Sequence, residues 1–208
     1  MKTLVLVDVQ NDFIPGGSLE VPGGDRIIEP INRIQDQFEL VIATQDWHPL
    51  DHVSFASNHE GLKPFDVIEM NGMDQVLWPD HCVQGTEGAQ FHPDLEMNRI
   101  EAIFRKGTSP DIDSYSGFYD NGHQKTTGLS GYLREKNAQH LYFGGLAADI
   151  CVYFTMKDAM EEGFKVTLVE EAVCALIDKD YKDRKRELRE LGGNIIREYT
   201  AGSLLQKK

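Results

Sequence analysis

The sequence predicts an α/β protein with three layers, in which a central sheet of six mostly parallel strands lies between helices. Short runs rich in aliphatic residues alternate along the chain with segments of helical periodicity. This alternation is typical of a parallel sheet that carries helices on both faces. The first run, residues 3–9, is almost continuously apolar, as expected of a strand that is covered on both sides.

The other elements are expected in the following order. Isoleucines at helical spacing predict a helix over residues 24–38, and a strand follows at 40–44. Residues 45–97 are polar with little periodicity, and so long a segment in a compact domain usually has a function or contains short elements. Further strands are expected at 100–105, 140–146, 166–169 and 194–199. Further helices are expected at 129–136, 150–162 and 179–191.

Length and composition are those of a single globular domain, which we expect to span residues 1–208. Of the 208 residues, 40% are hydrophobic and 26% are charged. The net charge of −13 argues against nucleic acid and against an anionic membrane surface as partners. No apolar run approaches the roughly 20 residues of a membrane-spanning helix. Three cysteines without a short paired spacing indicate a reducing compartment, and we expect a cytoplasmic location.

Polar side chains follow several of the predicted strands. In an open parallel sheet, ligands bind beyond the carboxyl ends of the strands. The residues expected there are Asp8, Asp46 with His48, Lys106, and the segment that ends at Cys151. Asp8 needs a partner, because an unpaired carboxylate is costly to bury. Lys106 is a candidate for that partner, although most lysines are simply solvated.

Cys151 is the preferred nucleophile among the three cysteines. It opens a predicted helix with Asp149 as N-cap, where the helix dipole and free amides favour a thiolate and can receive an oxyanion. The alternative is a small buried apolar cysteine, which describes Cys174 better. Cys82 is the rival nucleophile because His81 precedes it, but adjacent side chains usually point apart.

Residues 46–48 carry two side chains of metal-ligand type. Asp46 and His48 point to the same side of an extended chain, because the side-chain period is two. A carboxylate and an imidazole suit a divalent transition metal, and His81 offers a third ligand. Three further histidines of the segment 45–97, His52, His59 and His92, are spare candidates. Solvated loop histidines are the alternative, and spacing alone does not decide between the two.

Several common motifs are absent from the sequence. It has no Walker phosphate loop, no Gly-x-Gly-x-x-Gly after the first strand and no Gly-x-Ser-x-Gly elbow. Nucleotide binding and serine hydrolysis are therefore disfavoured. Aromatic side chains near the candidate residues can stack against a flat apolar substrate, although packing is the commoner role of any one of them. They are Phe13, Trp47, Trp78 and Tyr115.

Six segments, taken in order, resemble the nicotinamidases (pyrazinamidases) of the isochorismatase-like cysteine hydrolases. They are residues 8–13 (DVQNDF), 46–49 (DWHP), 78–83 (WPDHCV), 106–107 (KG), 113–118 (DSYSGF) and 145–152 (GLAADICV). The resemblance covers essentially the whole chain. Its Asp, Lys and Cys are shared with the wider superfamily, whereas the second and third segments are specific to nicotinamidases. One departure is Ala148, which stands where members commonly have Thr.

The resemblance implies the isochorismatase-like hydrolase fold and the hydrolysis of nicotinamide to nicotinate and ammonia in NAD salvage, with pyrazinamide as a second substrate. It implies a Cys thioester intermediate and a catalytic triad of Asp8, Lys106 and Cys151. It also implies a cis peptide bond before Ala147. The amides of Ala147 and Cys151 then form the oxyanion hole.

The resemblance further implies one divalent metal ion, held by Asp46, His48 and His81. Zinc is expected ahead of iron or manganese, and its task is to position the pyridine ring. His52 matches a fourth ligand of some members, at a shorter spacing. The substrate-lining aromatics implied are Phe13, Trp78 and Tyr115.

Two other hypotheses stay open. A related cysteine hydrolase that acts on another small amide keeps the fold and the triad but lacks the metal segments. The other is a non-catalytic doubly wound module that binds a nucleotide or a flavin. The absence of phosphate-binding loops speaks against it. The sequence does not decide whether identical chains form an oligomer.

Overall fold

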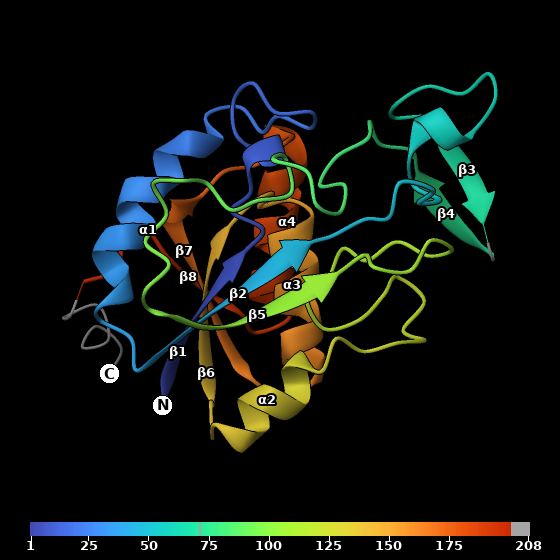
Figure 1. Ribbon diagram of the computed structural model, residues 1–208. Coiled ribbons are helices and arrows are strands. Elements are labelled where there is room, and N and C mark those ends of the chain that lie inside the picture. Colours follow the sequence, from blue (N-terminus) through green and yellow to red (C-terminus); the bar gives the residue numbers. More distant parts are fainter. Residues whose placement is uncertain (71, 201–208) are drawn as a thin grey trace.

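A parallel six-stranded sheet forms the centre of the computed structural model, which describes residues 1–70 and 72–200 (Figure 1). Its strand order is β5-β2-β1-β6-β7-β8. The strands are β1 (Lys2–Val7), β2 (Leu40–Asp46), β5 (Ile100–Lys106), β6 (His140–Gly145), β7 (Lys165–Val173) and β8 (Asn194–Ile196). Neighbouring strands in this order pair in parallel, which confirms the predicted sheet.

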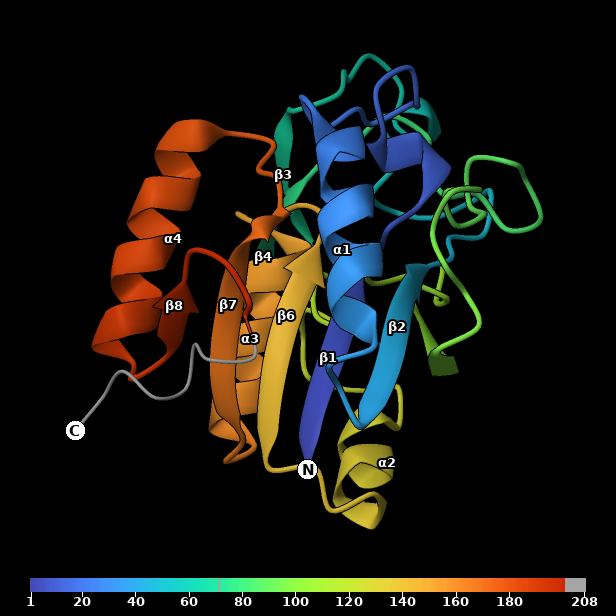
Figure 2. The same cartoon turned by 90° about the vertical axis from the view of Figure 1, so that its left-hand side faces the viewer.

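Helices cover both faces of the sheet (Figure 2). One face carries the 3-10 helix η2 (Gly24–Ile27) and α1 (Ile28–Gln35). The other carries α2 (Leu129–Glu135), α3 (Cys151–Glu161) and α4 (Asp178–Glu190). Leu4 and Leu6 of β1 join the core on the α1 side, whereas Val5 and Val7 join the core on the α3 side. Both sides of β1 are thus buried, which explains its continuous apolar run and confirms the predicted three layers.

The segment between β2 and β5 contains elements that the sequence did not reveal. These are the 3-10 helix η3 (Ala56–Asn58) and an antiparallel pair, β3 (Val67–Met70) and β4 (Met73–Val76). The pair stands apart from the main sheet, at the right of Figure 1. Its strands have only four residues each, and Gln75 is the one buried residue among them, so they are too short to show the alternation that identifies a strand from sequence.

Other boundaries differ from prediction by a few residues. The helix predicted over 24–38 begins as a 3-10 turn and ends at Gln35. Residues 201–208, the end of the predicted domain, lie outside the described residues. Among the residues that the structure describes, no helix is long and apolar enough to cross a membrane.

The topological switch point of the sheet lies at β1. Strands β2 and β5 extend the sheet on one side of β1, whereas β6, β7 and β8 extend it on the other. In open α/β sheets this switch point marks the ligand crevice, beyond the carboxyl ends of the strands. The carboxyl ends of β1, β2, β5 and β6 are therefore the place to look for a site.

Candidate active site

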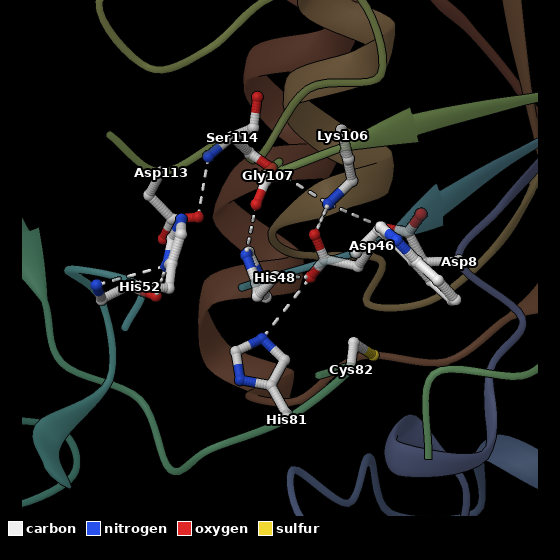
Figure 3. Close-up of polar contacts among 12 residues, drawn as sticks. Asp8, Asp46, His48, His52, His81, Cys82, Lys106, Gly107, Asp113 and Ser114 are labelled. Atoms are coloured by element: carbon white, nitrogen blue, oxygen red, sulfur yellow. Dashed lines mark hydrogen bonds and ion pairs between the residues drawn. The ribbon is translucent and has the colours of Figure 1, made fainter. Parts of the chain in front are cut away.

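Lys106, the last residue of β5, contacts Asp8 just beyond β1 and Asp46 at the end of β2 (Figure 3). Its Nζ forms an ion pair with Asp8 Oδ2 at 2.9 Å and donates to Asp46 Oδ1 at 3.0 Å. It also donates to the carbonyl of Ser114 at 3.0 Å and lies 3.6 Å from Cys151 Sγ. Lys106 is only 2% exposed, so this buried ammonium is stabilised by its two carboxylates.

Asp8 lies one residue beyond β1, in a left-handed conformation with φ 49°. Thr44 Oγ1 donates to its Oδ1 at 2.6 Å. Burial raises the pKa of Asp8, and the charge of Lys106 and the Thr44 hydroxyl oppose that rise. Sequence reasoning missed Thr44, although a hydroxyl residue near the end of a buried strand is a usable signal.

The pKa values of Lys106 and Cys151 are both shifted by their buried surroundings. Burial opposes its ammonium form, but the carboxylates of Asp46 and Asp8 raise the pKa of Lys106 well above its usual value. Burial raises the pKa of the Cys151 thiol well above its usual value, with Lys106 opposing. The expected thiolate, favoured by the helix start, is therefore wrong for this state, because burial outweighs it. Cys151 needs a base.

The turn before α3 differs from prediction in one respect. The residue before the helix is Ile150, whose side chain makes no capping bond, so the predicted Asp149 N-cap is wrong. Asp149 instead accepts the N–H groups of Leu176 and Ile177, each at 2.8 Å. It thereby fixes the loop after β7 against the turn that carries Cys151.

The backbone around Cys151 leaves two amides free. The peptide bond between Leu146 and Ala147 is cis, as expected. The amides of Ala147 and Cys151 donate to no backbone carbonyl of the described residues. At Gly145, with φ +123°, an added Cβ would lie 2.0 Å from the carbonyl oxygen of Val7. Only glycine therefore permits this close approach of β6 to β1.

Asp46, His48 and His81 form a buried set of potential metal ligands. Asp46 Oδ2 lies 3.0 Å from His48 Nε2 and 3.5 Å from His81 Nε2, opposite the oxygen that faces Lys106 (Figure 3). The Nδ1 atoms of the two histidines lie 2.9 Å and 2.8 Å from the carbonyls of Gly107 and Pro79. Donation from Nδ1 to a carbonyl is the arrangement that leaves Nε2 free to bind a metal.

His52 belongs to a second, adjoining set with His48 and Asp113. Its ring centroid lies 4.1 Å from that of His48, and its Nδ1 lies 2.7 Å from Ser54 Oγ. Burial lowers the pKa of His52 to about 4, so the ring is neutral. Its Nε2 is buried without a partner among the described residues. A neutral imidazole with an orphaned nitrogen fits a metal ligand.

His59, His92 and Trp47, which the sequence also offered, contact other parts of the chain and do not belong to the metal-ligand set. The Nε2 atom of His59 lies 2.7 Å from the carbonyl of Val53, and His92 Nδ1 accepts the N–H of Asp94. Trp47 is covered by the guanidinium of Arg105, 3.9 Å from its ring centroid.

A pocket of about 390 Å³, including space open to solvent, is lined both by Cys151 and by the predicted metal ligands Asp46 and His81. Its wall includes all three predicted aromatics, the predicted metal ligands Asp46 and His81, and Cys151 with Ala147. Its full lining is Phe13, Leu19, Val21, Asp46, Trp78, His81, Asp113, Tyr115, Ala147, Ile150, Cys151 and Leu176. The aliphatic residues of this lining were not predicted, because nothing in a sequence distinguishes them from residues of the hydrophobic core.

Among the described cysteines, Cys151 alone lines this pocket. Cys82 is fully buried in the core, and burial raises the pKa of its thiol well above its usual value. Its N–H donates to Asp12 Oδ2 at 2.7 Å, so this residue holds a loop in place. The structure therefore favours Cys151 over Cys82.

Comparison with known proteins gives one consistent family. The isochorismatase domain model matches residues 2–198. The nicotinamidase of Escherichia coli (strain K12) is 43% identical over 203 residues, which is 96% of this chain and 94% of the relative. The solved nicotinamidase/pyrazinamidase of Acinetobacter baumanii is 45% identical, with a TM-score of 0.91 over 94% of this chain and 95% of that one. The zinc complex of the Pyrococcus horikoshii pyrazinamidase is 36% identical, with a TM-score of 0.77 over 95% and 99%.

Proposed function

The chain belongs to the isochorismatase family, and we propose that it hydrolyses nicotinamide to nicotinate and ammonia in NAD salvage, and pyrazinamide in the same way. The observation that carries this proposal is the buried contact of Lys106 with Asp8 and Cys151 beside a small aromatic-lined pocket. A flat heteroaromatic amide fits such a pocket, because aromatic walls stack against its ring and the polar groups meet its carboxamide. The curated nicotinamidase of Escherichia coli (strain K12) supports this proposal, since it aligns with 96% of this chain at 43% identity.

The first half of the reaction uses the triad of Asp8, Lys106 and Cys151. Asp8 takes the proton of the buried Cys151 thiol, and the sulfur bonds to the carboxamide carbon while the C=O electron pair moves to oxygen. The amides of Ala147 and Cys151 donate to that oxyanion, each worth about 3–4 kcal/mol in comparable sites. The C–N bond then breaks, and the nitrogen leaves as ammonia with the proton from Asp8.

The second half releases the product. Asp8 takes a proton from water as the water oxygen bonds to the thioester carbon. The C–S bond breaks, and the sulfur regains a proton. Lys106 holds Asp8 in place through both halves, since its ammonium contacts that carboxylate and the nucleophile.

A divalent metal ion fits the residues beside the triad. Asp46, His48 and His81 would hold it, and His52 adds a fourth imidazole or carboxylate donor to the neighbourhood. When bound, the ion supplies a Lewis acid for the pyridine nitrogen that orients the ring for attack. We propose zinc, which suits one carboxylate and several imidazoles and is present in the Pyrococcus horikoshii pyrazinamidase structure. Iron and manganese are the alternatives.

Phe13, Trp78 and Tyr115 are the proposed substrate-contacting aromatics. Phe13 ends the short 3-10 helix η1 (Asn11–Phe13), and the rings of Trp78 and Tyr115 meet edge to face at 6.3 Å. The single domain over 1–208, a cytoplasmic location, and the exclusion of nucleic acid and membranes as partners stay predictions from composition and charge. Whether identical chains assemble is left open.

Ammonia release from a panel of small amides tests the substrate. The panel contains nicotinamide, pyrazinamide, benzamide and an aliphatic carbamoyl amide, each at several concentrations. We expect turnover of nicotinamide and pyrazinamide, and a much lower kcat/KM for benzamide, whose ring has no nitrogen for the metal. Preference for the aliphatic amide would instead indicate a related cysteine hydrolase of another substrate class.

A further inference from the structure

A second group of metal-ligand side chains lies outside the catalytic pocket. His123, Asp158 and Glu161 each offer a donor atom within 4.8 Å of the others. Asp158 and Glu161 lie three residues apart on α3, and therefore on one side of that helix. His123 comes from the loop between β5 and α2, and its Nε2 lies 3.4 Å from Asp158 Oδ1. None of the proposed catalytic or substrate-binding residues belongs to this group.

Asp158 is the unusual member of the group. It is only 5% exposed, and its Oδ2 is shielded from solvent without a hydrogen-bond partner among the described residues. Its other oxygen, Oδ1, lies 3.4 Å from His123 Nε2. A carboxylate has about four acceptor positions. Asp158 is therefore a buried acceptor whose surroundings satisfy it only in part, which is costly unless a cation is nearby.

The loop that carries His123 is held in a defined shape. Asp120 accepts three backbone N–H groups from the loop, those of Gly122, Gln124 and Lys125, at 2.8–3.1 Å. His123 itself has φ 52° and stacks on Tyr119 with the ring centroids 4.8 Å apart. The imidazole is thus fixed on the side of the loop that faces α3. Because Asp120 is occupied within the loop, it does not compete for a ligand there.

The three side chains line a solvent-accessible cleft that a hydrated ion can enter. The cleft encloses about 790 Å³, including space open to solvent, and Asp74 and Asp120 also line it. Lys157 is the cationic side chain of its wall, so carboxylates outnumber it. Tyr115 lines both this cleft and the catalytic pocket, and therefore separates the two sites.

We propose that His123, Asp158 and Glu161 bind a second divalent transition-metal ion. One imidazole and two carboxylates from a loop and a helix are an ordinary donor set for such an ion, with water completing the shell. The ion would join the loop over residues 120–125 to α3, the helix that begins with Cys151. This proposal does not rest on the proposed function, because it uses neither the triad nor the Asp46 set.

Zinc stoichiometry tests the proposal on the purified full-length chain. The protein is stripped with a chelator, dialysed against Zn²⁺ over a range of concentrations, and analysed for bound zinc. We expect two equivalents for the wild type and one for His123→Ala and for Glu161→Gln. Both substituted side chains are exposed, so these variants should fold, whereas Asp158→Asn changes a buried group. His92→Ala and Glu190→Gln are the matched controls and should keep two equivalents.

The outcomes separate the two metal sites. A wild type that binds one equivalent, with that equivalent kept in His123→Ala and lost in His48→Ala, would overturn this proposal and leave the proposed function intact. Two equivalents that persist in the double variant His123→Ala/Glu161→Gln would also overturn it, because the second ion would then bind elsewhere. Loss of one equivalent in His123→Ala and none in His48→Ala would support this site and count against the Asp46 site.

Discussion

Replacing Thr44 by valine removes the only hydroxyl donor to Asp8 that the structure shows in its described part. Thr44 Oγ1 donates to Asp8 Oδ1 at 2.6 Å, and both residues are fully buried. Valine keeps the shape of threonine but cannot donate. A hydrogen bond to a charged group contributes about 1.5–3 kcal/mol, and one pKa unit corresponds to about 1.4 kcal/mol. We therefore expect the pKa of Asp8 to rise by about 1–2 units.

The direction in which the pH profile of the reaction should move follows from the role of Asp8 as base. The hydroxyl stabilises the carboxylate and opposes the burial that already raises its pKa, so its removal raises the pKa further. Because the proposed reaction needs the carboxylate form, the acidic limb of kcat/KM against pH should move to higher pH by about the same amount as the pKa. The measurement is the pH profile of ammonia release at low nicotinamide concentration.

Thr3→Val is the matched control. Thr3 is also a buried threonine of the central sheet, but its Oγ1 has no partner among the described residues. We expect Thr3→Val to leave the acidic limb where it is in the wild type. An unmoved acidic limb in Thr44→Val, or an equal movement in Thr3→Val, would refute the assignment of Asp8 as the base.

Four further predictions concern Lys106, the turn before α3 and two of the proposed metal ligands. Lys106→Met should abolish turnover and lower the free energy of unfolding by about 3–5 kcal/mol, because it leaves two buried carboxylates without their cation; urea denaturation measures the loss, and an unchanged midpoint contradicts it. Asp149→Ala should lower the free energy of unfolding by about 1–3 kcal/mol, because two partly buried N–H groups lose their acceptor, and the midpoint of thermal unfolding should fall below that of the wild type. Chelation, or His48→Ala, should raise KM for nicotinamide far more than it lowers kcat if the metal orients the ring; an equal loss in kcat at saturation would assign the metal a part in the chemistry. His52→Ala should weaken zinc affinity in equilibrium dialysis while leaving one site, and unchanged affinity would exclude it as a ligand.

The fold was predictable because its elements carry strong local patterns. Residues 3–9 read as a strand buried on both sides, and the structure buries β1 between the α1 core and the α3 core. Ligands bind beyond the carboxyl ends of parallel strands, and this rule predicted that Asp8, Asp46 and Lys106 lie at the site. The structure brings these three residues into contact. The pair β3 and β4 escaped prediction, because a strand of four residues is too short to establish a periodicity in the sequence.

Features that depend on three-dimensional surroundings could not be predicted from the sequence. The position of Asp149 before a helix suggested an N-cap, but only the folded chain shows that its carboxylate is used by the loop at Leu176 and Ile177. The helix start suggested a thiolate at Cys151, yet burial has the larger effect on its pKa. Burial is a property of the whole fold, so a local pattern cannot supply it.

The central claim is that Cys151 is the nucleophile of a nicotinamide hydrolase. Ammonia release from nicotinamide by the wild type, Cys151→Ala, Cys82→Ala and Cys174→Ala tests it most directly, at a temperature where all four chains are folded. We predict release by the wild type and by the Cys82 and Cys174 variants, and none by Cys151→Ala. Release by Cys151→Ala at the wild-type rate, or its loss in Cys82→Ala alone, would contradict the account.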